Sequence, residues 1–114
     1  MAQQLLKNID FSKVLDMERL VEYQQGTVIS KTLAQGAPLS ITLFAFDKGE
    51  EISSHSSDGD ALVYIMDGKA EITLGDQKHV LEKGQAIVMP AGIPHALMAN
   101  EQFKMMLIVV FSLQ

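Results

Sequence analysis

The stretch that decides the fold is residues 84–100, which read GQAIVMPAGIPHALMAN. A short apolar run ends at Pro90, and Pro94 follows four residues later. Proline lacks the backbone N–H that a central strand donates, so residues 90–94 are predicted to form a shaped loop. Extended structure resumes at His95. The sequence therefore predicts a strand, a loop and a second strand that begins with a histidine.

Outward from this stretch, the dominant pattern is an alternation of period two, which is typical of strands with one buried face. Residues 39–46 (LSITLFAF) show it, with Leu39, Ile41, Leu43 and Ala45 in one phase. Further strands are predicted at residues 61–66, 69–74, 77–81, 86–89, 95–99 and 103–111. The dipeptides Asp67-Gly68 and Gly75-Asp76 are interpreted as tight hairpin turns between such strands.

The first thirty residues carry a weaker pattern, with a helical turn expected at residues 16–19 and extended chain at residues 20–23 and 26–33. We find no repeats or linkers. The sequence predicts an all-β fold of about nine or ten short strands, at the spacing of a sandwich or barrel.

Composition excludes several classes of protein. The chain has 114 residues, a length that suits one domain. It has no cysteine, which excludes disulfides, thiolate metal sites and cysteine nucleophiles. A net charge of −5 and a single arginine, Arg19, argue against nucleic acid and anionic membranes as partners. The first residues lack the features of a secretory signal, and no apolar run could span a bilayer, so a cytoplasmic location is expected.

Two stretches together resemble the two signature motifs of the cupin superfamily. The second motif requires Gly, Pro-x-Gly and His at fixed spacing, and four positions match it: Gly84, Pro90, Gly92 and His95. Its closing Asn position holds Ala99, with Asn100 one step later. The first motif corresponds to residues 49–68 (GEEISSHSSDGDALVYIMDG), where Gly49, His55 and Gly68 match. There, Ser57 replaces the second His and Ala61 replaces the Glu.

The resemblance implies a double-stranded β-helix (jelly-roll) barrel formed by a single domain of residues 1–114. Residues 1–30 are then an N-terminal segment that packs on the barrel or on a dimer partner. Many single-domain cupins form dimers through an outer sheet face and an N-terminal strand. Apolar residues such as Tyr64, Met66 and Phe111 would suit a homodimer interface.

In metal-binding cupins, the motif His and Glu side chains hold one divalent ion, commonly iron, manganese, nickel or zinc. This chain keeps His55 and His95 as candidate ligands. Two imidazoles without a carboxylate make a weak site. Asp60 could supply a third ligand if residues 58–60 form a bulge. A metal-free site is favoured over a metal centre because half of the expected ligands are replaced.

The resemblance places a funnel around the two histidines, and the predicted ligand pocket consists of His55, Ser57, Ala61, Val63, His95 and Leu97. Further apolar lining is expected from Ile41, Leu43, Ile65, Met105 and Leu107. Methionine tolerates variable shapes, so Met89, Met98, Met105 and Met106 could form an adaptable wall, although core filling is the commoner role. His79 is interpreted as a surface residue.

Three functions remain open. The first is a non-catalytic domain that binds a small molecule in the funnel, with His55 and His95 as polar anchors. The second is a metal-dependent enzyme of the oxygenase or isomerase class. The third is a structural or interaction protein whose barrel is filled by its own side chains. The fold alone does not choose among them, and the two replaced ligands favour the first over an enzyme.

Overall fold

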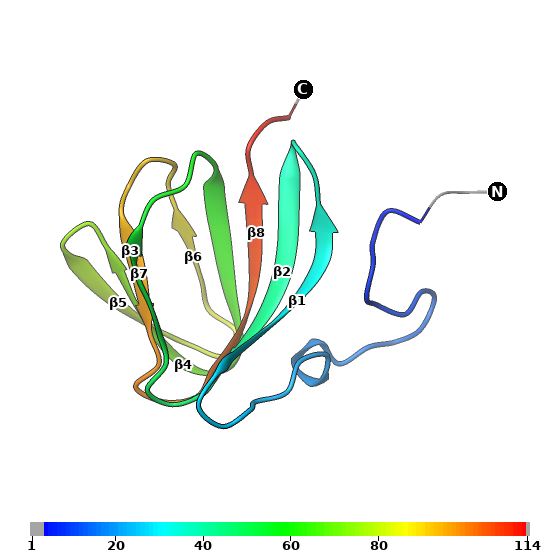
Figure 1. The fold of residues 1–114 in the computed structure, drawn as a ribbon, viewed down its shortest axis with the longest axis horizontal. Coiled ribbons are helices and arrows are strands. Elements are labelled where there is room, and N and C mark those ends of the chain that lie inside the picture. Colours follow the sequence, from blue (N-terminus) through cyan, green and yellow to red (C-terminus); the bar gives the residue numbers. More distant parts are fainter. Residues whose placement is uncertain (1–3, 114) are drawn as a thin grey trace.

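The computed structural model describes residues 4–113. Its elements are a 3-10 helix η1 (Met17–Arg19) and strands β1 (Val28–Gln35), β2 (Leu39–Phe46), β3 (Glu51–His55), β4 (Asp60–Leu74), β5 (Gln77–Glu82), β6 (Ala86–Met89), β7 (His95–Met98) and β8 (Phe103–Val110) (Figure 1). Within the described residues there are thus eight strands, fewer than the nine or ten predicted. No helix in residues 4–113 has the length and apolarity needed to cross a membrane.

The strands form an all-β, double-stranded β-helix barrel with two antiparallel sheets that share β4. The first half of β4 pairs with β6 and β8, and β2 and β1 extend this sheet A in the order β1-β2-β8-β4-β6. The second half of β4 pairs with β5 and β7, which gives sheet B the order β3-β7-β4-β5. The predicted jelly-roll fold is confirmed.

The predicted hairpin turn at Asp67-Gly68 is wrong, because β4 continues through both residues. Its pairing with β8 shifts between Ile65 and Asp67, and Gly68 has a φ of 75°. A bulge of this kind bends a strand and increases its twist, which lets β4 pass from one sheet to the other. The predicted turn at Gly75-Asp76 does form the hairpin between β4 and β5, with Gly75 at a φ of 59°.

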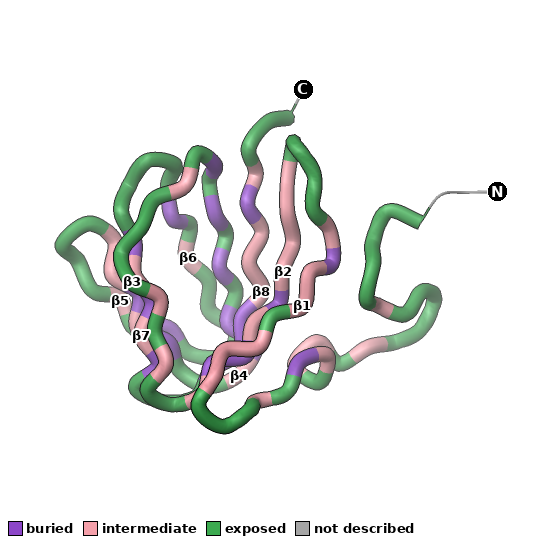
Figure 2. Tube along the Cα trace, viewed as in Figure 1, coloured by how far each residue is buried: buried purple, intermediate pink, exposed green. Residues whose placement is uncertain are grey.

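The main core lies between the two sheets. Buried and exposed positions alternate along β4, as Figure 2 shows. Val63, Ile65 and Ile72 are fully buried there. The rings of Phe46 and Phe103 stack with their centroids 4.4 Å apart. Burial of these large side chains supplies most of the stabilisation of such a barrel.

A second apolar cluster lies on the outer face of sheet A, under the N-terminal segment. Residues 1–3 of the predicted segment lie outside the described residues. Val21 packs there against Leu43, Ala45 and Met66, all of them buried. Leu43 was expected inside the barrel and Met66 on an exposed dimer face, and both predictions are wrong. Because both phases of β2 are apolar, alternation alone could not tell which phase faces inward.

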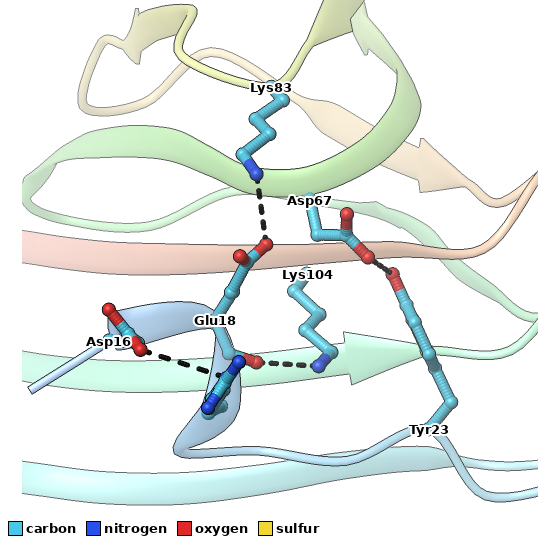
Figure 3. A network of polar contacts seen from close by, with 7 residues as sticks. Asp16, Glu18, Tyr23, Asp67, Lys83 and Lys104 are labelled. Atoms are coloured by element: carbon cyan, nitrogen blue, oxygen red, sulfur yellow. Dashed lines mark hydrogen bonds and ion pairs between the residues drawn. The ribbon is translucent and has the colours of Figure 1, made fainter.

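A polar network fixes the same segment to the barrel (Figure 3). The Lys104 ammonium group is buried, donates to the Glu18 carbonyl oxygen at 2.5 Å and lies 4.8 Å from the centre of the Tyr23 ring. The Tyr23 hydroxyl donates to Asp67 at 2.6 Å, and Lys83 pairs with the Glu18 carboxylate at 3.1 Å. Burial, and then the bond to Asp67, raise the pKa of Tyr23. The network ties η1 and Tyr23 to β4 and β8.

Candidate functional site

His55 and His95 meet at one end of sheet B. His55 ends β3, His95 begins β7, and the two residues are paired in the antiparallel register. Their Nε2 atoms lie 3.1 Å apart, and the rings are nearly perpendicular, with centroids 4.3 Å apart. His95 is buried and His55 is exposed. The structure therefore brings together the two histidines that the sequence singled out.

The other ring nitrogen of each histidine contacts a backbone carbonyl. His55 Nδ1 lies 3.0 Å from the Ser53 oxygen, and His95 Nδ1 lies 3.3 Å from the Ile93 oxygen. A carbonyl oxygen only accepts, so each contact is a hydrogen bond when Nδ1 carries the proton. The 3.1 Å contact between the two Nε2 atoms is likewise a hydrogen bond when one Nε2 carries a proton. When the protons lie on both Nδ1 atoms instead, both Nε2 atoms are acceptors, and two added donors or one cation would satisfy them.

The pKa of His95 is lowered, first by burial and then by the nearby His55. Burial penalises the charged imidazolium form. The lowered pKa therefore favours the neutral form of His95.

The residues around the pair do not complete a metal site. Two Nε2 atoms 3.1 Å apart would subtend about 100° at an ion bound at about 2.0–2.1 Å from each. In residues 4–113, however, no group of three His, Cys, Asp or Glu side chains could hold an ion. The Asp60 carboxylate accepts a hydrogen bond from the Ala91 N–H at 2.9 Å. The register shows no bulge at Asp60, which pairs regularly with Val110. The donor set present is too small for the three protein ligands that such ions usually require.

Comparison with known proteins places this geometry in a family. The profile of the Cupin domain family matches residues 42–111. The chain belongs to the cupin domain family. A conserved protein of unknown function from Streptococcus pyogenes is 48% identical, with 100% of this chain and 99% of that one covered and a TM-score of 0.95. A cupin superfamily protein from Desulfitobacterium hafniense is 36% identical over 94% of this chain and 98% of that one, with a TM-score of 0.89.

Among curated proteins, this cupin domain is similar to quercetin 2,3-dioxygenase from Bacillus subtilis. The two are 31% identical over 74 residues, which cover 64% of this chain. The aligned part is 22% of the length of the dioxygenase.

Several predicted pocket residues belong to the packed core of the cupin barrel. Ala61, Val63 and Leu97 are 2%, 0% and 3% exposed. Ala61, which replaces the motif Glu, packs in the same cluster as Met89. The Ser57 hydroxyl accepts a hydrogen bond from the Gly59 N–H at 3.1 Å. These residues fill space or stabilise a turn, so the histidine pair is the part of the site that is open to a ligand.

The structure also corrects the predicted apolar lining. Ile65 and Met105 are buried in the core, and Leu107 packs partly buried against it. Ile41 packs with the outer cluster of sheet A, as does Met106. Phe44 and Ile87 instead pack partly buried against the inner core. The sequence missed Phe44 because residues 40–46 are apolar or small in both phases.

Core filling, the commoner role expected of the four methionines, is confirmed for two of them. Met89 and Met105 are core residues, with 2% and 1% exposure. Met98 pairs with Glu71 and Glu51, next to the buried inward-facing Leu97, so it lies on the outer face of sheet B. Two of the four methionines therefore fill the core, and Met98 and Met106 face away from it.

His79, interpreted from the sequence as a surface residue, is half-buried. It pairs with the fully buried Ile72 and therefore projects from the inner face of sheet B. His95 pairs with Leu74, two residues further along the same face. All three histidines of the chain therefore face the interior side of sheet B. The alternation of residues 77–81 carried this signal, since His79 and Leu81 share a phase.

Proposed function

We propose that this cupin domain is a non-catalytic module that binds a small hydroxylated organic molecule at the His55–His95 pair. The observation that carries the proposal is the orientation of the two rings. Their Nδ1 atoms are held by backbone carbonyls, and their Nε2 acceptors lie 3.1 Å apart. When both Nδ1 atoms carry the proton, a ligand with two neighbouring hydroxyl groups donates one proton to each Nε2. The exposure of His55 leaves room for such a ligand.

Quercetin is a suitable probe because it is a small polyphenol, and because the name of the similar Bacillus subtilis protein identifies it as a substrate there. Binding is measured by isothermal titration calorimetry on the untagged protein. We expect His55→Ala and His95→Ala each to weaken binding about tenfold, which corresponds to one lost hydrogen bond of about 1.4 kcal/mol. Ser30→Ala, at an exposed position of β1 outside both sites, serves as the control and should leave the affinity unchanged. Affinity that does not depend on His55 would contradict the proposal.

A metal-dependent enzyme of the oxygenase or isomerase class is the second candidate. The separation of the Nε2 atoms favours it, since two imidazoles on one ion would lie this close. Iron, manganese, nickel and zinc are the ions to test. Elemental analysis of the untagged protein that finds about one ion per chain would support the enzyme if the ion is lost in both His55→Ala and His95→Ala. Loss of quercetin binding when a chelator is added would also support it. Binding that survives the chelator supports the non-catalytic module.

A purely structural role is the third candidate. The burial of Ala61, Val63 and Leu97 favours it, because a barrel filled by its own side chains needs no ligand. The absence of any His55-dependent binding in the calorimetric experiment would point to this role.

We propose further that the domain acts as a homodimer in the cytoplasm. Leu62, Tyr64 and Val88 are 39%, 38% and 53% exposed on the outer face of sheet A. Leu62 pairs with Val88 on β6 and with Ile108 on β8, so the apolar surface is continuous across three strands. A second copy that covered this face would remove the apolar surface from water. Light scattering should give a dimer for the wild type and a monomer for Val88→Glu, with Ser30→Glu on β1 as the control.

A further inference from the structure

The side of the barrel between β5 and β6 is open. Each of these strands pairs with β4 alone, β5 with its second half and β6 with its first half (Figure 1). Each strand therefore has one unpaired edge. A concavity of about 610 Å³ lies there, lined by residues 78–81 of β5 and residues 85–87 at the start of β6. This volume is within the range of small-molecule sites, about 300–1,000 Å³.

His79 lies on one wall of this opening. Its ring is half-buried on the inner face of sheet B and has no hydrogen-bond, ion-pair or ring partner among residues 4–113. Leu81, two residues along the same face, is 5% exposed. Ile87 on the opposite wall pairs with the fully buried Val63 and so also faces inward. The opening thus combines an unpartnered imidazole with aliphatic side chains that continue into the core.

The charge of the lining selects among ligands. Lys78 is its one charged residue, and the lining contains no carboxylate, although the chain carries a net charge of −5. The unpaired strand edges add backbone N–H donors. Hydrogen-bond donors and a positive charge next to aliphatic surface suit a molecule with one apolar end and one acidic end.

We propose that the opening between β5 and β6 is a second binding site, for a small amphipathic organic anion. The apolar part of the ligand lies against Leu81 and Ile87, and its acidic group accepts a hydrogen bond from His79. The site is separate from the His55–His95 pair. On sheet B, β5 with His79 and β7 with His95 lie on either side of β4, and the two histidines are offset by two residues along the strands. Strand geometry then separates them by about 12 Å. The proposal does not depend on the proposed function.

The test uses 8-anilinonaphthalene-1-sulfonate, an aromatic anion whose fluorescence rises when it is bound, with the full-length chain. We expect saturable binding that weakens at least fivefold in His79→Leu. Gln85→Glu, which adds a carboxylate at an exposed position of the lining in the same phase as Ile87, should also weaken it at least fivefold. The matched controls are His55→Leu for the lost imidazole and Ser30→Glu for the added charge. Both variants should bind the probe with an affinity within twofold of that of the wild type. Far-UV circular dichroism verifies that each variant is folded.

A second measurement locates the probe directly. In a carbon–proton correlation NMR spectrum, the three histidine rings give three sets of imidazole signals. Addition of the probe should shift the His79 signals and leave those of His55 and His95 in place. Shifts confined to His55 and His95 would place the probe at the other site and overturn this proposal while supporting the first. No saturable binding, or binding that neither His79→Leu nor Gln85→Glu weakens, would also overturn it.

Discussion

Replacement of Gly68 by alanine tests the explanation of how β4 crosses between the two sheets. Gly68 has a φ of 75°, a conformation that disfavours an alanine by about 1–2 kcal/mol. A Cβ built on Gly68 would also overlap the Gln102 carbonyl oxygen and lie 2.9 Å from the Phe103 Cα. Both neighbours are backbone atoms, so the chain itself must move. Strain of this kind adds about 1–3 kcal/mol, and we expect Gly68→Ala to lower the free energy of unfolding by about 2–5 kcal/mol in total.

Gly75→Ala is the matched control. Gly75 also has a positive φ, of 59°, but a Cβ there would have no atom within 4 Å. Only the conformational penalty of about 1–2 kcal/mol applies to this variant. The comparison therefore isolates the steric contribution at Gly68, and the expected loss is a large part of the 5–15 kcal/mol typical of a domain.

The assay is urea unfolding followed by far-UV circular dichroism, since the chain has no tryptophan. Protein concentration is held constant, because a dimer would make the midpoint concentration-dependent. If the free energy of unfolding falls with urea concentration at the same slope in both variants, their native and unfolded states are otherwise comparable. Losses of stability that agree within about 0.5 kcal/mol would refute the steric role of Gly68.

Three further predictions concern the N-terminal network and the missing ligands. Lys104→Met removes a buried, charged hydrogen bond and should lower the free energy of unfolding, measured in urea, by about 1.5–3 kcal/mol. In the control Lys83→Met an exposed ion pair is lost, and the free energy of unfolding should fall by less than about 1 kcal/mol. The free energy of unfolding of wild type should exceed that of Tyr23→Phe below pH 10, and this difference should shrink as the pH rises above 10 in urea titrations. The raised pKa keeps Tyr23 protonated in the folded state, whereas Tyr23 of the unfolded chain ionises near its usual pKa, which stabilises the unfolded state. The double variant Ser57→His, Ala61→Glu should have a lower thermal midpoint than wild type without metal, because the side chain introduced in place of Ala61 would be a buried carboxylate without a counter-charge. Zinc or manganese should raise the midpoint again by supplying that charge.

Sequence reasoning found the family and most of the strands, because motif spacing and period-two alternation both follow from local geometry. It failed at Gly68 because an Asp-Gly pair with a positive φ suits a hairpin turn and a bulge equally well. It failed at Leu43 because the N-terminal segment covers the outer face of sheet A, so apolar residues are required on both faces. Coverage by a distant segment leaves no local trace in the sequence of the strand.

For the site, the sequence identified His55 and His95 but not the surroundings that determine what they can bind. The Nδ1 atom of each ring contacts a backbone carbonyl, and this contact depends on the bend of the chain at Ser53 and Ile93. His79 lies between the polar Lys78 and the apolar Val80, so its neighbours do not show which face of the strand it occupies. The shared phase with Leu81 was the available signal, and the pairing with Ile72 fixes the direction of the ring.

The fate of the four motif positions argues for a binding role of the histidine pair. Ser57 and Ala61 have structural roles, one in a turn through the Gly59 N–H and the other in the core. His55 has an exposed ring whose polar contacts in the described part of the chain are with the Ser53 carbonyl and His95. The core of the barrel therefore does not depend on this imidazole as it depends on Ala61, which is 2% exposed. When both Nδ1 atoms carry the proton, the facing Nε2 atoms are two acceptors that a ligand with two donors can satisfy, and this is the physical basis of the proposed binding role.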